Sequence, residues 1–244
     1  VFLSTWSCCV GVLFCFSCTP HICGNKGTAD KRKKATEERE KRKHSPKPAW
    51  DVAAINNPLT SNVVGPKSEG SAVLRAQILL DRANFSPGEI DGHYGENLRV
   101  AIESYQAAHK MPVTRTVDAA TWQSLNVDLN PAIVPYTITA EEVQGPFEPL
   151  PHELMEQAHL KALGYQSAAE ELGEKFHVQP KLLADLNKDK DLGKAGEQIL
   201  VPGVQRPPGR VQADRVVVVK SKRTVSSLAK DGAAAAESIT DLVK

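Results

Sequence analysis

The stretch GEIDGHYGENLRVAIESYQ, from Gly88 to Gln106, constrains the fold more than any other part of the chain. Its first half is rich in glycine and acidic residues, which is typical of a tight turn. Its second half has apolar residues at helical spacing. We predict that Gly92 and Gly95 let the backbone bend twice around Asp91, whose carboxylate can accept hydrogen bonds from backbone N–H groups and lock the turn.

Three short helices are predicted around this turn, in a domain of residues 71–130. Ser71 is expected to cap the first helix, whose apolar face includes Leu74. Asn97 is expected to cap the second helix, and Asp118 the third. Because three such helices can enclose a small apolar core, we expect a three-helix bundle.

Several fixed spacings accompany the turn between residues 76 and 125. They are Gln77 and Leu80, the Ile90-Asp91-Gly92-x-Tyr94-Gly95 turn, Ala101-Ile102, Tyr105-Gln106, and the Asp118-x-x-Thr121-Trp122-x-x-Leu125 ending. On these residues the segment resembles the peptidoglycan-binding domain found beside many bacterial cell-wall enzymes. The resemblance implies peptidoglycan as the partner, and no cofactor. One departure is Arg115, which stands where the family usually has a second glycine; a left-handed backbone there would cost about 1 kcal/mol.

We expect the ligand to bind at the turn and at the helix that follows it, because the turn displays His93 and Tyr94 beside the start of that helix. The candidate ligand-binding residues are Asp91, His93, Tyr94, Tyr105 and Gln106. A disaccharide-peptide offers hydroxyls, amides and flat sugar faces, which suit exposed Tyr, His, Asp and Gln side chains. The alternative interpretation assigns the tyrosines to the core of the bundle and gives Asp91 a structural role in the turn.

Residues 131–203 read as strand, helix, helix and strand. PYTIT and QILVP are the strand segments, and AAEELGEKF and KLLADLN between them have helical apolar spacing. With the patterns Leu182-x-x-x-Leu186-Asn187 and Gly196-Glu197-x-Ile199-x-Val201-Pro202, this module resembles a LysM module, a family that binds glycans containing N-acetylglucosamine. An insertion from Ala140 to Gly164 departs from that family. The expected fold class is mainly α, with a small α+β second module.

All five cysteines lie in the first 23 residues, so the rest of the chain has no disulfide framework and no thiolate site. Residues 1–23 are mostly apolar and are expected to be an export signal or a lipoprotein-type anchor, with Cys18 and Cys23 as lipidation candidates. Membrane anchoring is thus expected at the N-terminus. Residues 24–70 are basic and then Pro-rich, and are expected to be a flexible linker.

Residues 204–244 are expected to be a linker followed by strand, turn and strand, because Val216 to Val219 forms a continuous apolar run. This hairpin resembles the opening of an L,D-transpeptidase catalytic domain, whose Cys nucleophile and His lie in a Ser-His-Gly-Cys sequence. The chain has no Cys after Cys23 and no His after His177, and its last stretch, AAAAESITDLVK, reads as a short helix. We therefore expect an incomplete start of that domain, truncated before the nucleophile.

Together these patterns predict an exported bacterial protein of the cell envelope that binds peptidoglycan and is not an enzyme. A net charge of +1 and an aromatic content of 5% give no reason to expect nucleic acid, although a basic tether at residues 26–43 would be the place for it. Two further alternatives stay open. One is a wall hydrolase that uses carboxylates, and the other is a scaffold that binds a protein partner.

Overall fold

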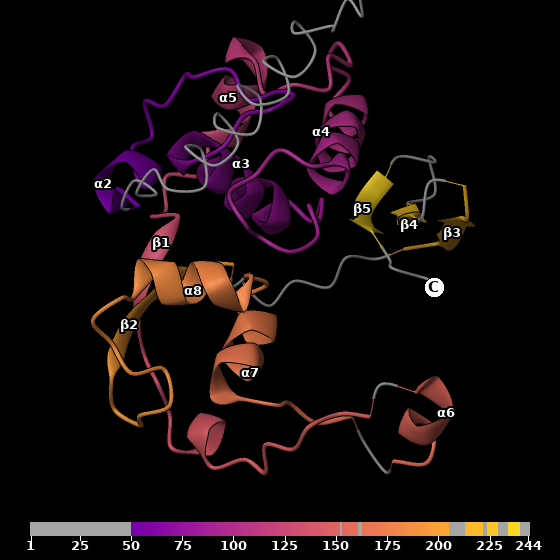
Figure 1. The fold of residues 1–244 in the computed structure, drawn as a ribbon. Coiled ribbons are helices and arrows are strands. Elements are labelled where there is room, and N and C mark those ends of the chain that lie inside the picture. Colours follow the sequence, from indigo (N-terminus) through magenta and orange to yellow (C-terminus); the bar gives the residue numbers. More distant parts are fainter. Residues whose placement is uncertain are drawn as a thin grey trace, which may run out of the picture. The chain divides into compact units, whose positions relative to one another are not determined.

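The computed structural model describes residues 50–151, 153–160, 163–204, 213–221, 224–228 and 234–239 (Figure 1). The export segment with Cys18 and Cys23 and the basic stretch after it lie outside these residues. No helix within the described ranges is long and apolar enough to cross a membrane.

Helices α3 (Ser71–Arg82), α4 (Glu96–Ala108) and α5 (Ala119–Leu125) surround one apolar core. Their apolar residues recur at helical spacing, which gives each helix one face to bury. The buried side chains of this core include Val73, Ala76, Leu79, Leu80, Leu98, Ile102, Tyr105, Trp122 and Leu125. Figure 1 shows the three helices together.

Two of the three expected helix caps are wrong. Gly70, and not Ser71, is the N-cap of α3, with a φ of 101° that glycine adopts without steric cost. Gly95, and not Asn97, is the N-cap of α4. The third cap is confirmed, because the Asp118 carboxylate accepts a hydrogen bond from the backbone N–H of Thr121 at 2.9 Å.

Residues 50–70 belong to the fold, so the expectation of a flexible linker that reaches Gly70 is wrong for this part. A short helix, α2 (Val52–Ile55), follows the cap residue Asp51 and buries Ile55 completely. Val64 is also buried and forms a backbone bridge with Val117, through hydrogen bonds of 2.8 and 3.1 Å. We call residues 50–130 the first module.

The second module, residues 131–204, contains a two-stranded antiparallel sheet and two helices. Strand β1 (Ile133–Thr137) pairs with β2 (Gln198–Pro202), with Tyr136 opposite Ile199. Helices α7 (Ala168–Lys175) and α8 (Pro180–Leu186) lie between the strands in sequence and bury Leu172, Leu182 and Leu183. The order strand, helix, helix, strand is as expected.

The insertion between β1 and α7 carries two short helical segments. They are the 3₁₀ helix η1 (Glu141–Val143) and α6 (Leu154–Gln157). No residue of α6 is buried, and Figure 1 shows it on an extended connection, away from α7.

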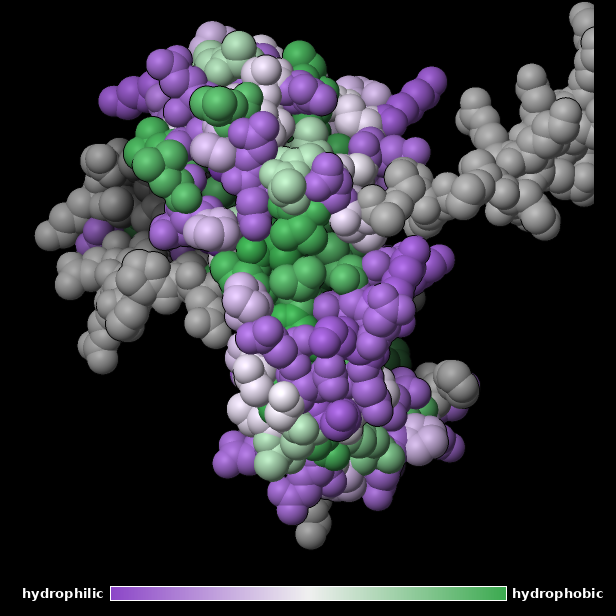
Figure 2. Space-filling model, turned by 90° about the vertical axis from the view of Figure 1, so that its left-hand side faces the viewer, coloured by the Kyte–Doolittle hydropathy of each residue, from purple (hydrophilic) through white to green (hydrophobic). Residues whose placement is uncertain are grey.

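The two modules share an apolar core. Ile55, Leu74, Ile78 and Ile90 of the first module pack with side chains of the second, at 0% exposure for each of the four. The second module contributes Ile133, Ile138, Leu172, Phe176, Val178, Leu183, Ile199 and Val201, among others. One face of the molecule also shows apolar surface between two more hydrophilic regions (Figure 2).

Backbone pairing joins the modules as well. Ile90 and Val178 form a parallel bridge, in which the Ile90 N–H donates to the His177 carbonyl at 2.8 Å and the Gln179 N–H donates to the Ile90 carbonyl at 3.0 Å. Burying these polar groups without partners would be costly, so the pairing fixes the register between the modules.

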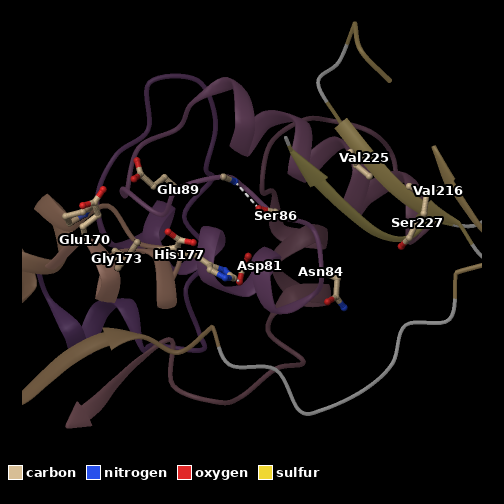
Figure 3. A pocket seen from close by; sticks show the side chains of 14 residues that line it. Asp81, Asn84, Ser86, Glu89, Glu170, Gly173, His177, Val216, Val225 and Ser227 are labelled. Atoms are coloured by element: carbon tan, nitrogen blue, oxygen red, sulfur yellow. Dashed lines mark hydrogen bonds and ion pairs between the residues drawn. The ribbon is translucent and has the colours of Figure 1, made fainter. Parts of the chain in front are cut away.

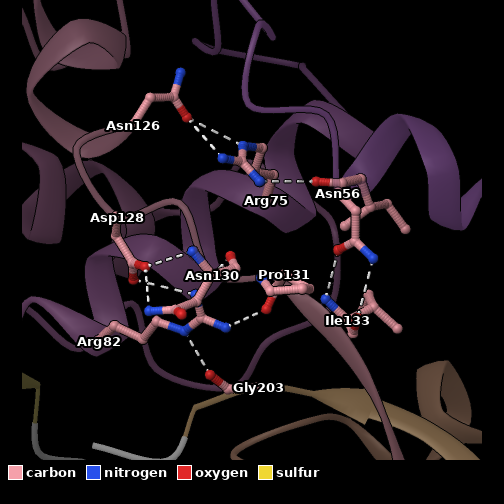
Figure 4. Close-up of polar contacts among 10 residues, drawn as sticks. Asn56, Arg75, Arg82, Asn126, Asp128, Asn130, Pro131, Ile133 and Gly203 are labelled. Atoms are coloured by element: carbon pink, nitrogen blue, oxygen red, sulfur yellow. Dashed lines mark hydrogen bonds and ion pairs between the residues drawn. The ribbon is translucent and has the colours of Figure 1, made fainter.

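Side chains of the first module hold the chain where it enters the second (Figure 4). The Asn56 amide donates to the Ile133 carbonyl at 3.0 Å and accepts from its N–H at 2.8 Å, as a neighbouring strand would. The Arg82 guanidinium donates to the carbonyls of Asn130, Pro131 and Gly203 and pairs with the Asp128 carboxylate. These contacts use the planar fork of donors that distinguishes Arg from Lys.

The C-terminal part forms a three-stranded antiparallel sheet in the order β3–β4–β5. Strands β3 (Arg215–Val219) and β4 (Thr224–Leu228) make the expected hairpin. The last stretch was expected to be a short helix, and this is wrong, because β5 (Ala234–Ile239) pairs with β4. Alanine has high helix propensity, but pairing with an adjacent strand overrides so weak a preference.

Candidate functional site

The Asp91 turn, residues 90–95, has one left-handed residue at its centre. Gly92 has a φ of +74°, and its carbonyl accepts a hydrogen bond from Gly70 N–H at 2.9 Å. The Asp91 carboxylate accepts from the His93 N–H at 2.9 Å, which is the bond expected to lock the turn. The Asp91 carboxylate thus has a structural contact within the turn.

A buried glutamine holds the turn from below. Gln77, on α3, is 1% exposed. Its side-chain oxygen accepts from the Gly92 N–H at 2.8 Å, and its side-chain nitrogen donates to the Asp91 carboxylate at 2.9 Å. Because both ends of the amide are used, the turn has a fixed orientation relative to α3.

Trp50 covers the turn from the other side. A Cβ atom placed on Gly92 would lie 2.4 Å from Cη2 of Trp50, a distance that no real Cβ tolerates. Gly95 is different, because its φ is −110° and a Cβ there would meet open space. The expectation that both glycines are needed for bends is therefore wrong for Gly95.

Two predicted ligand-binding residues lie at the surface of the turn. The His93 side chain is 47% exposed, and its Nδ1 lies 3.6 Å from the Glu69 carboxylate. Tyr94 is half-buried and donates its hydroxyl to the Arg115 carbonyl at 2.6 Å. Burial raises the pKa of Tyr94, so its hydroxyl stays protonated and serves as a donor near neutral pH.

Tyr105 and Gln106 face the interior, which argues against the predicted ligand contacts. Tyr105 is 3% exposed, stacks on His109 with 4.1 Å between ring centroids, and hydrogen-bonds Ser124 through its hydroxyl. Gln106 is 0% exposed, donates to the Thr116 carbonyl and accepts from the Arg115 N–H. Both lie on the core side of α4. Helical spacing in the sequence does not show whether a polar side chain on such a helix is buried or exposed.

A row of charged side chains borders the turn along α4. Arg99 pairs with Glu96 and, at 2.9 Å, with Glu103, which Arg115 also contacts at 2.9 Å. Burial alone would raise the pKa of Glu103, but hydrogen bonds from Arg115 and Arg99 outweigh it and hold the pKa below its usual range. Arg115 has a φ of +61°, so the anticipated left-handed backbone is present.

A cavity of about 760 Å³ is lined in part by Ser86, Gly88 and Glu89, which come just before the Asp91 turn in the sequence (Figure 3). The carboxylates of Asp81, Glu89, Glu170 and Glu174 line it, together with His177. Asp81 is 1% exposed, and its carboxylate lies 3.1 Å from Nδ1 of His177. Residues far apart in the sequence thus form an acidic cavity that no local spacing could have revealed.

A buried carboxylate anchors the loop after β1. Glu142 accepts hydrogen bonds from the Tyr136 hydroxyl at 2.9 Å and from the Thr139 N–H at 2.8 Å, and it pairs with Lys175. Burial alone would raise the pKa of Glu142, but these bonds hold it below its usual range. Asn187 is similarly structural, since its amide bonds the backbone of Leu200 in both directions.

No three His, Cys, Asp or Glu side chains are arranged to hold a metal ion in the part of the chain that the structure describes. His152 lies outside the described residues, while His159 is exposed beside α6.

Sequence reasoning missed Trp50 and Glu69, which border the turn. Both fall in a Pro-rich stretch whose composition is typical of a linker. One available signal was Trp50, because Trp is seldom left without a packing partner. Another was the apolar run Val52–Ile55 directly after Asp51, a residue that often caps a helix.

A comparison with models of known protein families matches the segment that contains the Asp91 turn. No curated protein matches the chain. Residues 69–125 match the family model described as "Putative peptidoglycan binding domain". The matched segment begins at Glu69, which pairs with His93 across the turn, and it ends at Leu125, the last residue of α5. This part of the chain therefore matches a peptidoglycan-binding domain, and the match supports a role in binding the cell wall.

Proposed function

We propose that this chain binds peptidoglycan non-covalently through the surface around the Asp91 turn and catalyses no reaction. The match of residues 69–125 to a peptidoglycan-binding domain carries the proposal. The geometry supports it, because Gln77, Trp50 and the Asp91 carboxylate hold the turn in one conformation while His93 stays exposed. A preformed surface avoids part of the ordering cost of binding.

The second module is proposed to bind glycan as well. Its strand, helix, helix, strand order and its resemblance to a LysM module support this idea. Two sites held on one body would raise the overall affinity through effective concentration. The proposed place of action is the bacterial cell envelope, where the polymer is found.

The resemblance of residues 211–232 to the opening hairpin of an L,D-transpeptidase supports a targeting role. In this proposal the described modules concentrate a polypeptide on the wall. The thiol chemistry of that family has no counterpart in this sequence, which has no Cys after Cys23.

Sedimentation with purified insoluble peptidoglycan tests the proposal. The full chain should appear in the pellet in a saturable manner, and should remain in the supernatant with an insoluble polymer of unrelated chemistry such as cellulose. Recovery in the supernatant with both polymers would remove the proposal.

One observation favours a second candidate function, a wall hydrolase. The acidic cavity gathers four carboxylates, and a carboxylate pair is what glycoside hydrolysis requires. Release of reducing sugar ends from walls, abolished by Glu174→Gln and Glu89→Gln together, would support the hydrolase. Unchanged walls after prolonged incubation with the purified chain would support non-catalytic binding.

A further inference from the structure

We infer that a groove between the two modules, the junction groove, binds a short peptide-free stretch of the wall glycan. The groove has a volume of about 540 Å³ and lies where the chain passes from one module to the other. This inference rests on the proposed function, since it takes peptidoglycan as the partner. It adds a second contact, away from the Asp91 turn, whose lining residues apart from Arg82 lie outside the matched segment 69–125.

The walls of the junction groove come from both modules. Arg82, Asp128 and Asn130 belong to the first module, while Val134, Tyr136 and Phe176 belong to the second. The shared core and the Ile90–Val178 bridge hold these walls together. A ligand in the groove would therefore meet a fixed surface.

The lining of the groove has an apolar part and a polar part, and a sugar likewise has an apolar C–H face and polar hydroxyl and amide groups. Val134 and Tyr136 lie two residues apart on β1, so their side chains lie on the same face of the strand. Together with Pro135 they give one wall a largely apolar lining, which suits the C–H face of a pyranose ring and the methyl of an N-acetyl group.

The residues that the first module contributes to the groove present hydrogen-bonding groups. The Asp128 side chain is 30% exposed, and its carboxylate accepts from the Asn130 N–H at 2.9 Å and from Arg82 at 3.1 Å. A carboxylate has about four acceptor positions, so it can also accept from a sugar hydroxyl. Asn130 is exposed; its side-chain nitrogen donates to the Asp128 carboxylate at 2.9 Å, and its side-chain oxygen can accept from the N–H of the N-acetyl group.

The Tyr136 ring, which lines the junction groove, is held by residues beside the groove. Lys175, which lines another cavity and not this groove, places its Nζ 4.6 Å from the ring centroid. The hydroxyl is fixed by Glu142 at 2.9 Å. The ring is thus held in one orientation as part of the groove wall.

Charge and size are compatible with a short glycan whose only charges are the lactyl carboxylates of N-acetylmuramic acid. Arg82 and Asp128 form an ion pair, so the groove has no net excess of either sign to attract nucleic acid or a strongly charged peptide. Its volume falls within the range of about 300–1,000 Å³ that is typical of small-ligand sites. A disaccharide unit fits this range.

The test uses the full chain and a soluble tetrasaccharide of alternating N-acetylglucosamine and N-acetylmuramic acid without peptide. Backbone amide signals of Asn130, Val134 and Tyr136 should shift on titration and saturate. The same titration with a maltotetraose, which has no N-acetyl groups, should leave them in place.

Two variants change the groove, each with a matched control. Asn130→Ala removes the amide, and Val134→Phe fills the apolar side; Asn62→Ala and Val63→Phe make the same changes at exposed positions of the first module. We expect Asn130→Ala to weaken tetrasaccharide binding by about two- to tenfold, the effect of losing one hydrogen bond. The controls should bind as the unchanged chain does, and unfolding midpoints should confirm that all four variants fold.

Absence of shifts at the groove would overturn the inference, whatever the variants do. If insoluble walls still sediment the chain in that case, the proposed function stands and only the groove is wrong. If the walls leave the chain in the supernatant, both fail. Equal binding by Asn130→Ala, Val134→Phe and their controls would also contradict the groove.

Discussion

The indole of Trp50 lies over Gly92, so closely that a Cβ on this glycine would be 2.4 Å from Cη2 of the ring. The contact joins a residue from the expected linker to the centre of the Asp91 turn. It means that the turn is enclosed on two sides, by Trp50 and by Gln77 on α3. The conformation that displays His93 therefore depends on residues outside the turn itself.

Substituting the turn glycine should destabilise the fold. Gly92→Ala would place a side chain at a φ of +74°, which costs about 1–2 kcal/mol, and would also displace Trp50. We expect the free energy of unfolding in urea to fall by more than about 1 kcal/mol. The matched change Gly95→Ala should be nearly neutral, because the loss of an N-cap glycine is offset by a stiffer unfolded chain. Equal losses in the two variants would refute the assigned turn.

Removing the amide beneath the turn should have a comparable effect. Gln77→Leu would leave the buried Gly92 N–H without its acceptor at 2.8 Å, which costs about 1–3 kcal/mol. Gln123→Leu, on the exposed side of α5, should change the unfolding free energy by less than about 0.5 kcal/mol. Urea unfolding of both variants checks this, and a Gln77→Leu chain as stable as the control would contradict the role of Gln77.

The sequence was sufficient to predict the three helices between residues 71 and 125, because their apolar spacing is local. Helical periodicity placed α3, α4 and α5, and Asp118 was recognisable as a cap. The caps at Gly70 and Gly95 were missed because each neighbouring Ser or Asn offered a better side-chain acceptor. In the structure, Gly70 instead donates its N–H to the Gly92 carbonyl, a contact between residues distant in sequence.

The site was harder to predict than the fold, for a related reason. Tyr105 and Gln106 have the chemistry of ligand-binding residues, yet both are consumed by internal contacts. The contact of Trp50 with Gly92 depends on tertiary packing. So does the bridge between Ile90 and Val178 that joins the two modules. Contacts between residues distant in sequence cannot be predicted from the residue pattern of a single segment.

The buried Glu142 should make stability depend on pH. Its pKa is held below the usual value of 4.5, so its ionised form favours the folded state above that pH, and this stability is lost as the pH falls through the lower, folded-state pKa. Glu142→Gln should be less stable than the unchanged chain by about 1–2 kcal/mol at pH 7. The difference should narrow below about pH 4.5. Urea unfolding at pH 7 and pH 3.5 measures it.

The neighbouring exposed residue provides the control for this pH dependence. Glu141→Gln should follow the unchanged chain at both pH values. A difference between Glu142→Gln and the unchanged chain that stays constant from pH 7 to pH 3.5 would show that the Glu142 charge is not what stabilises the loop.

The shared core should make the modules unfold together. Leu183→Ala, at a fully buried position in α8, should lower the free energy of unfolding by about 2–4 kcal/mol. Amides of α4 in the first module should then lose hydrogen-exchange protection by the same free energy as amides of β2. If α4 kept its protection, the modules would be independent, and the core common to both would be refuted.

Binding at the turn is tested most directly by adsorption isotherms of the full chain and of His93→Ala on purified peptidoglycan. The His93 side chain is 47% exposed, so its removal should leave the unfolding midpoint unchanged. The account predicts saturable binding by the unchanged chain and about two- to tenfold weaker binding by His93→Ala. His159→Ala, an exposed histidine beside α6, should bind as the unchanged chain does. Identical isotherms for the three chains, or no adsorption of any of them, would contradict wall recognition at the Asp91 turn.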